Sequence, residues 1–115
     1  MASVADLIGN TPLVELQKLN TNINVKILAK LEGDNPGGSV KDRPVFNMIK
    51  SALERGDIKK NTKLIEATSG NTGIAMALAA NLFELEVELA MPANSTRERV
   101  LTMEAYGAKI TLLES

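Results

Sequence analysis

One lysine of this chain stands where its side chain can do chemistry, in the stretch Asn-Pro-Gly-Gly-Ser-Val-Lys-Asp-Arg over residues 35–43. Lys41 follows a glycine-serine turn and opens a segment with helical periodicity. An amine held in such a place can form a Schiff base with a carbonyl compound. The alternative is a solvated lysine on a surface turn. Spacing alone favours that alternative by roughly three to one, because most lysines are solvated.

A second polar loop, Thr-Ser-Gly-Asn-Thr-Gly over residues 68–73, joins a predicted strand to a predicted helix. Its N–H groups and hydroxyls can converge on an anion at the helix N-terminus. Ligands of open α/β sheets also bind at this end of a strand. The alternative is a turn whose side chains only cap the helix, and we weigh the two about evenly. A carboxylate-binding loop together with a reactive lysine favours pyridoxal-phosphate chemistry on an amino acid.

Composition removes most other kinds of catalytic site. The 115 residues include no Cys and no His. Disulfides, a thiol nucleophile, a Ser-His-Asp triad and imidazole or thiolate metal ligands are therefore excluded, and no metal site is expected. This exclusion raises the relative weight of a catalytic lysine. The net charge of -1 gives no footprint for nucleic acid.

Apolar runs in this chain are too short to span a bilayer, so no membrane partner is expected. The N-terminus has no basic segment and no signal-peptide core. A cytoplasmic protein is therefore the default expectation.

The elements that must position the two motifs follow from the periodicity of the apolar residues. Alternating patterns predict five strands, and stripes repeating every three to four residues predict three helices. Gly56 and Gly107 are expected to end two of the helices. The predicted strands cover residues 13–16, 25–31, 63–67, 86–91 and 109–113, and the predicted helices cover 41 or 42 to 55, 72–82, and a segment reaching about 106.

The third predicted helix follows Ser95-Thr96-Arg97-Glu98, which fits the capping-box pattern. On that helix Arg97 and Arg99 could meet an anion, but a solvated face is the simpler expectation. From residue 63 onward the order is βαβαβ, which implies a parallel, right-handed sheet covered by helices. The expected fold class is α/β, with a three-layer parallel sheet.

The chain is expected to form a single segment over residues 1–115. Residues 1–40 would hold the N-terminal strands and the lysine loop, and residues 41–115 the βαβαβ part of a smaller domain. A parallel strand normally needs cover on both faces, and the strand at 109–113 has no helix after it. We therefore expect this domain to be truncated.

Six segments together carry a family resemblance. The chain resembles the cysteine synthases, pyridoxal-phosphate-dependent β-replacement enzymes of fold type II that are related to cystathionine β-synthase and tryptophan synthase β. The form Gly-Gly-Ser-Val-Lys-Asp-Arg is similar to that of the B branch. The matching segments are residues 8–14, 30–32, 35–43, 66–73, 91–92 and 106–108.

The resemblance implies roles for both motifs. Lys41 would carry pyridoxal phosphate as a Schiff base and then act as general base on the α-proton of O-acetylserine. Sulfide would replace acetate, giving L-cysteine, with the cofactor as electron sink. Asn71 would also hydrogen-bond the cofactor's ring oxygen. The residues implied to bind the substrate carboxylate are Thr68, Ser69, Gly70, Asn71 and Thr72.

Members of this family are much longer, and the resemblance is to their N-terminal part. It implies that the loop holding the cofactor's phosphate lies outside these residues, and that the full-length protein is a homodimer. Two alternatives stay open at this point. One is a non-catalytic remnant or truncated product, and the other is a related pyridoxal-phosphate enzyme such as a cystathionine β-synthase.

Overall fold

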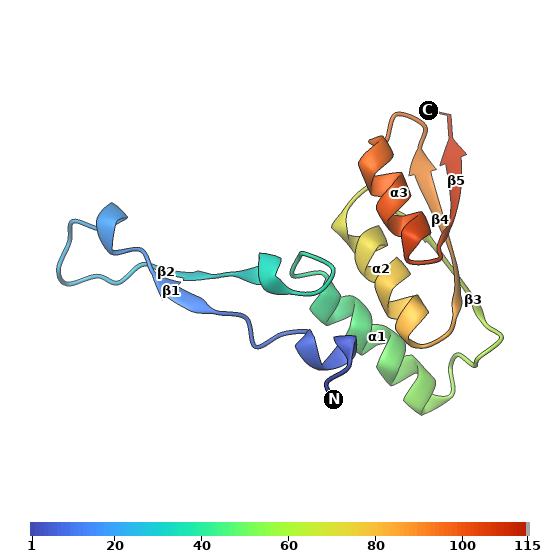
Figure 1. The fold of residues 1–115 in the computed structure, drawn as a ribbon, viewed down its shortest axis with the longest axis horizontal. Coiled ribbons are helices and arrows are strands. Elements are labelled where there is room, and N and C mark those ends of the chain that lie inside the picture. The colour runs from blue at the N-terminus through green and yellow to red at the C-terminus, as the bar shows by residue number, and fades with distance from the viewer. Residues whose placement is uncertain (115) are drawn as a thin grey trace.

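A computed structural model describes residues 1–114 and shows an α/β body from which a two-stranded hairpin projects (Figure 1). The hairpin is antiparallel, and the body holds three parallel strands and three helices. In chain order the elements are η1 (Val4–Leu7), β1 (Leu13–Glu15), η2 (Gln17–Leu19), β2 (Leu28–Lys30), η3 (Glu32–Asp34), α1 (Asp42–Arg55), β3 (Lys63–Ala67), α2 (Asn71–Leu82), β4 (Glu86–Pro92), α3 (Arg97–Ala105) and β5 (Lys109–Leu113).

The body confirms the expected βαβαβ order and the parallel sheet. Its strands lie in the order β3-β4-β5, and Leu89 pairs with Glu66 on one side and with Ile110 on the other. Figure 1 shows the three helices on the same side of this sheet. The carboxyl ends of all three strands therefore meet at one edge, where the loop over residues 68–73 begins.

The core lies between the sheet and the helices. β4 alternates in burial, and its residues Val87, Leu89 and Met91 are buried on the helix side. The buried residues that α2 brings to this core are alanines, and Ile74 and Met76 pack against it from partly buried positions. Small side chains let this helix approach the strands closely, so the chain can pack a core with few aromatic residues.

The opposite face of the sheet is more open. Ile65 is 68% exposed and Leu113 is 51% exposed. A polar cluster lies on the same face. In it, Glu88 forms ion pairs with Lys63 and Lys109 and accepts a hydrogen bond from Thr111. Within residues 1–114, no helix covers this face (Figure 1), so the described residues form two layers, a sheet and its helices, where three layers were expected.

Helix α1 has the predicted limits. It starts at Asp42, so Pro44 falls in the first turn, where its missing N–H costs nothing. Gly56 ends the helix with φ +79°, a left-handed conformation that glycine adopts without strain. Helix α2 and strands β3 and β5 also lie within one residue of their predicted ranges.

Two local predictions are wrong. The strand expected over residues 25–31 is only Leu28–Lys30, which pairs with the three residues of β1. The capping box at Ser95 is absent. Helix α3 begins one residue later than that pattern requires, so Thr96 is the cap residue and its side chain makes no capping hydrogen bond.

None of the helices found in residues 1–114 is both long enough and apolar enough to cross a membrane.

Candidate functional site

Lys41 is the last residue before α1 and is exposed. Its backbone N–H donates to Ser39 Oγ at 3.1 Å, and Ser39 itself is buried. The main chain at Lys41 is therefore fixed by a neighbouring turn, while the side chain extends from the helix start. An amine placed in this way is accessible to a ligand that approaches the N-terminus of α1.

Asp42 follows Lys41 and is nearly inaccessible, with 2% of its surface exposed. Its Oδ2 accepts the Gly37 N–H, which draws the preceding turn onto the helix. Burial raises the pKa of the Asp42 carboxyl, and the Gly37 hydrogen bond opposes that shift. Gly37 is packed so tightly against this carboxylate that an added Cβ would collide with it. The turn before Lys41 is thus fixed by the contact between Gly37, where it begins, and Asp42, directly after Lys41.

Glu32 accepts hydrogen bonds from three separate segments. Arg43 donates to it twice, from Nε to Oε2 at 2.8 Å and from Nη2 to Oε1 at 2.9 Å. Thr11 Oγ1 donates to Oε1 at 2.7 Å, and Asn35 Nδ2 donates to Oε2 at 3.0 Å. Asn35 also accepts the Gly9 N–H through Oδ1 at 2.8 Å. Thr11 and Glu32 lie at the base of the hairpin, before β1 and after β2, and are called the hairpin stem. The hairpin stem and the first turn of α1 are therefore joined at the Glu32 carboxylate.

These contacts have a clear electrostatic consequence. Hydrogen bonds from Arg43, and then from Thr11, lower the pKa of Glu32 from 4.5 to about 2. The same pairing raises the pKa of Arg43. Glu32 thus stays ionised across the physiological range, and the bidentate pair persists there.

The loop over residues 68–73 leaves β3 and enters α2. The Thr68 N–H donates to the Ala90 carbonyl at 3.0 Å, which extends the pairing of β3 with β4 by one residue. Arg99 Nη1, on α3, donates to the Ser69 carbonyl at 2.9 Å. The Gly73 N–H donates to the Gly70 carbonyl at 3.0 Å and begins the helical turn. Asn71 is exposed at the first position of α2.

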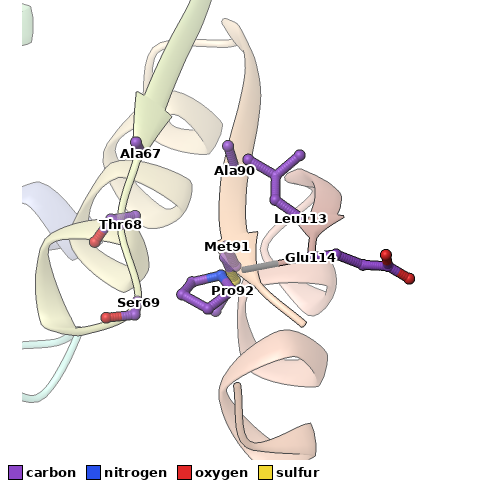
Figure 2. Close-up of a pocket in the computed structure, with 8 residues that line it drawn as sticks. All are labelled: Ala67, Thr68, Ser69, Ala90, Met91, Pro92, Leu113 and Glu114. Atoms are coloured by element: carbon purple, nitrogen blue, oxygen red, sulfur yellow. The ribbon is translucent and has the colours of Figure 1, made fainter. Parts of the chain in front are cut away.

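A pocket of about 370 Å³ opens at the carboxyl ends of the three strands (Figure 2). Figure 2 shows the hydroxyls of Thr68 and Ser69 turned to the same side, away from Leu113. Most of the wall is made of small or apolar groups. The lining residues are Ala67, Thr68, Ser69, Ala90, Met91, Pro92, Leu113 and Glu114.

A second hollow, of about 420 Å³, lies between α1, β3 and α2. Thr72 and Glu66 supply its polar groups, and Met48 and Met76 are among its apolar ones. The loop therefore borders two hollows, with Thr68 and Ser69 on one and Thr72 on the other.

The two sequence motifs lie at the same end of the molecule. Helices α1 and α2 pack against each other, and Figure 1 shows their N-termini side by side. Lys41 stands at the first of these ends and Gly70 and Asn71 at the second. Lys41, Gly70 and Asn71 line neither of the two hollows. The structure thus brings the motifs to one edge without enclosing a site between them.

No individual role was predicted from the sequence for Glu32 or Arg43. Both residues lie in segments that carried the family resemblance, and that resemblance was the only sequence feature that could have pointed to them. Arg99 was expected on a solvated face; it is exposed, but it also holds the Ser69 carbonyl.

A family model for pyridoxal-phosphate dependent enzymes matches residues 4–115. The chain belongs to this family. Cysteine synthase B of Pseudomonas aeruginosa is 55% identical over 111 residues, which are 96% of this chain and 37% of that protein. The O-acetylserine dependent cystathionine beta-synthase of Bacillus subtilis is 43% identical, over 96% of this chain and 36% of that protein.

Solved structures of the pyridoxal-phosphate-dependent family agree with this fold. The crystal structure of cysteine synthase from Entamoeba histolytica superposes with a TM-score of 0.92 and 42% identity, covering 99% of this chain and 35% of that one. The expected fold type II architecture is thereby confirmed. The chain spans little more than a third of the length of each of these relatives.

Proposed function

We propose that this chain supplies the reactive lysine and the substrate loop of a cysteine synthase, which replaces the acetate of O-acetylserine with sulfide to give L-cysteine. The observation that carries the proposal is the placement of Lys41 and the 68–73 loop at the adjacent N-termini of α1 and α2 (Figure 1). The 55% identity to a cysteine synthase B supports it.

The residues present suit pyridoxal phosphate. The exposed amine of Lys41 can bind the cofactor's aldehyde carbon, and the exposed amide of Asn71 can donate to its ring oxygen. When bound, the cofactor supplies an electron sink for carbanion chemistry at the substrate's α-carbon. No metal chemistry is proposed, and residues 1–114 hold no cluster of three or more acidic, Cys or His groups that could bind a metal ion.

Lys41 has a second role in the proposal. With substrate bound, the free amine of Lys41 would accept the proton from the substrate's α-carbon. This role requires the amine to stay close to the place where it was bound. The fixed backbone at Ser39 and Lys41 supplies that restraint.

The loop would hold the substrate carboxylate. The N–H groups of Asn71 and Thr72, the first two residues of α2, have no carbonyl partner one turn earlier in the helix, and they lie at the positive end of its dipole. Hydroxyl groups of the same loop add further donors. The proposed binding residues are Thr68, Ser69, Gly70, Asn71 and Thr72.

Cystathionine synthesis is the second candidate, because a relative with that activity in its name is 43% identical. The higher identity to cysteine synthase B, 55%, favours sulfide as the acceptor. We also propose a cytoplasmic protein that is a homodimer at full length, with an amino acid and a sulfur donor as its small-molecule partners. Sedimentation of the full-length protein tests the dimer.

The test is cysteine formation by the whole protein that contains these residues. We expect O-acetylserine and sulfide to give cysteine, and Lys41→Ala to abolish the reaction. Lys50→Ala is the matched control, since Lys50 is an exposed lysine on α1, the helix that begins directly after Lys41. Retained activity in Lys41→Ala would overturn the proposal. A faster reaction with a thiol amino acid than with sulfide would instead select the second candidate.

A further inference from the structure

We propose that Glu32 and Arg43 are positioning residues for Lys41, and that their bidentate pair fixes the first turn of α1 in the place from which Lys41 meets its ligand. The inference rests on the proposed function, in which Lys41 carries the cofactor. It adds a task for two residues that do not themselves touch the reacting atoms.

The pair fixes the helix start against segments that are distant in sequence. Arg43 lies two residues after Lys41, within the same turn of α1. Its guanidinium donates to Glu32, which precedes the turn over residues 37–41, called the lysine turn. It also donates to Thr11 Oγ1 at 3.0 Å, and Thr11 precedes the hairpin. A planar guanidinium bound at two points to one carboxylate fixes direction as well as distance. Rotation or sliding of the helix start would break both hydrogen bonds.

Contacts on the other side of Lys41 complete the restraint. Ser39 holds the Lys41 N–H, and Asp42 holds the Gly37 N–H. The residues on each side of Lys41 are therefore tied down, while Lys41 itself is exposed. A site that needs a reactive amine in one place requires this combination of a fixed backbone and an accessible side chain.

If the Glu32–Arg43 pair served only the stability of the fold, it would not have to lie beside Lys41. The buried contacts of α1 come from Val45 and Ile49, which belong to the hydrophobic core. The Glu32 and Arg43 side chains are 23% and 36% exposed and lie outside that core. The pair thus joins the lysine turn to the hairpin stem and does not fill the interior.

The molecule offers a matched control at Glu88. Its side chain is 20% exposed, it contacts Lys63, Lys109 and Thr111, and these contacts lower its pKa to about 2, as for Glu32. It lies on the sheet, away from the lysine turn. Glu32→Gln and Glu88→Gln therefore remove the same charge from comparable networks, and only the first network touches the residues around Lys41.

The experiment uses the full-length protein that contains these residues, prepared without cofactor, and pyridoxal phosphate as the probe. The adduct is fixed with borohydride, and peptide mass mapping gives the initial rate at Lys41 relative to Lys50. A displacement of ~1 Å can cost on the order of 100-fold in rate, so Glu32→Gln should slow Lys41 at least about tenfold. Arg43→Lys keeps the charge but loses the two-point geometry, and should behave in the same way.

Glu88→Gln should leave the relative rate at Lys41 unchanged, whatever it does to the melting temperature. The proposal is overturned if Glu32→Gln and Arg43→Lys modify Lys41 at the wild-type rate. It is equally overturned if Glu88→Gln slows Lys41 as much as Glu32→Gln does, because the effect would then report stability alone.

Amide hydrogen exchange, measured without cofactor, separates this inference from the proposed function. Glu32→Gln should speed exchange over residues 38–45 and leave β4 protected. If wild-type Lys41 of the full-length protein forms no adduct, the proposed function fails, and the exchange result alone decides whether Glu32 fixes the turn. Unchanged exchange over residues 38–45 would overturn the positioning role.

Discussion

Arg99 on α3 holds the carbonyl of Ser69, with Nη1 donating to the oxygen at 2.9 Å across thirty residues of sequence. The next hydrogen bond on the β3 side joins the Thr68 N–H to the Ala90 carbonyl at 3.0 Å. The start of the loop over residues 68–73 is therefore attached to α3 at one residue and to β4 at the adjacent one. Within the loop, the Gly70 N–H donates to Thr68 Oγ1 at 3.4 Å and the Gly73 N–H donates to the Gly70 carbonyl. The proposed anion site therefore relies on the N–H groups of Asn71 and Thr72.

Replacing Arg99 should loosen this loop. A net hydrogen bond contributes ~1 kcal/mol, so Arg99→Ala should weaken binding of a substrate carboxylate by about fivefold. Exchange of the amides near Ser69 should also quicken. Arg97→Ala is the matched control, because it removes the same charge from the same helix. Equal effects of the two variants on carboxylate binding would show that only the net charge matters.

The start of α2 should not tolerate a methyl group at Gly73. A Cβ there would lie 2.5 Å from Thr68 Cγ2 and 2.9 Å from Met103 Cε. We expect Gly73→Ala to lower the free energy of unfolding by about 1–3 kcal/mol, as overpacking typically does. Denaturant unfolding measures this change.

A double variant tests the cause of that loss. Thr68→Ser removes the colliding methyl group, so Gly73→Ala with Thr68→Ser should recover part of the stability. Strict additivity of the two changes would show that the collision with Thr68 is not the cause.

The turn before Lys41 should depend on Gly37. A side chain at that position would collide with the Asp42 carboxylate, whose Oδ2 already accepts the Gly37 N–H. Gly37→Ala should therefore destabilise the chain by about 1–3 kcal/mol. Gly33→Ala is the control, because a Cβ at Gly33 meets nothing within 4 Å. Similar melting temperatures for the two variants would contradict this account of the turn.

Stability should fall as the pH drops from about 4.5 to about 2. The pKa values of Glu32 and Glu88 are lowered from 4.5 to about 2 in the folded chain, so their contribution is present above 4.5 and lost as they are protonated. Asp42, whose pKa is raised, acts in the opposite direction. Glu32→Gln should flatten the dependence of the melting temperature on pH in this window. An unchanged slope in that variant would contradict the assignment.

Much of the fold follows from local patterns in the sequence. β3 matches its predicted range because apolar positions and the polar loop after Ala67 mark its limits. The end of α1 was predictable because Gly56 can take the left-handed conformation. The length of β2 was not, since it depends on the three residues that β1 offers for pairing.

The site was predictable only in part. The spacing of residues 35–43 and 68–73 pointed to the two helix starts, where the structure places Lys41 and Asn71. The roles of these residues stay predictions. The contacts around Glu32 could not be foreseen, because Thr11, Asn35 and Arg43 come from segments that only the folded chain brings together. No local periodicity in the sequence predicts contacts between segments that lie so far apart.

The most direct measurement is the site of pyridoxal-phosphate attachment in the full-length protein that contains these 115 residues. The protein is mixed with the cofactor, reduced with borohydride and mapped by peptide mass spectrometry. The account predicts a band in the near-ultraviolet or blue that borohydride removes, with the label concentrated on Lys41 and absent from that peptide in Lys41→Ala. Label spread evenly over the exposed lysines, or a band that is unchanged in Lys41→Ala, would contradict the central claim.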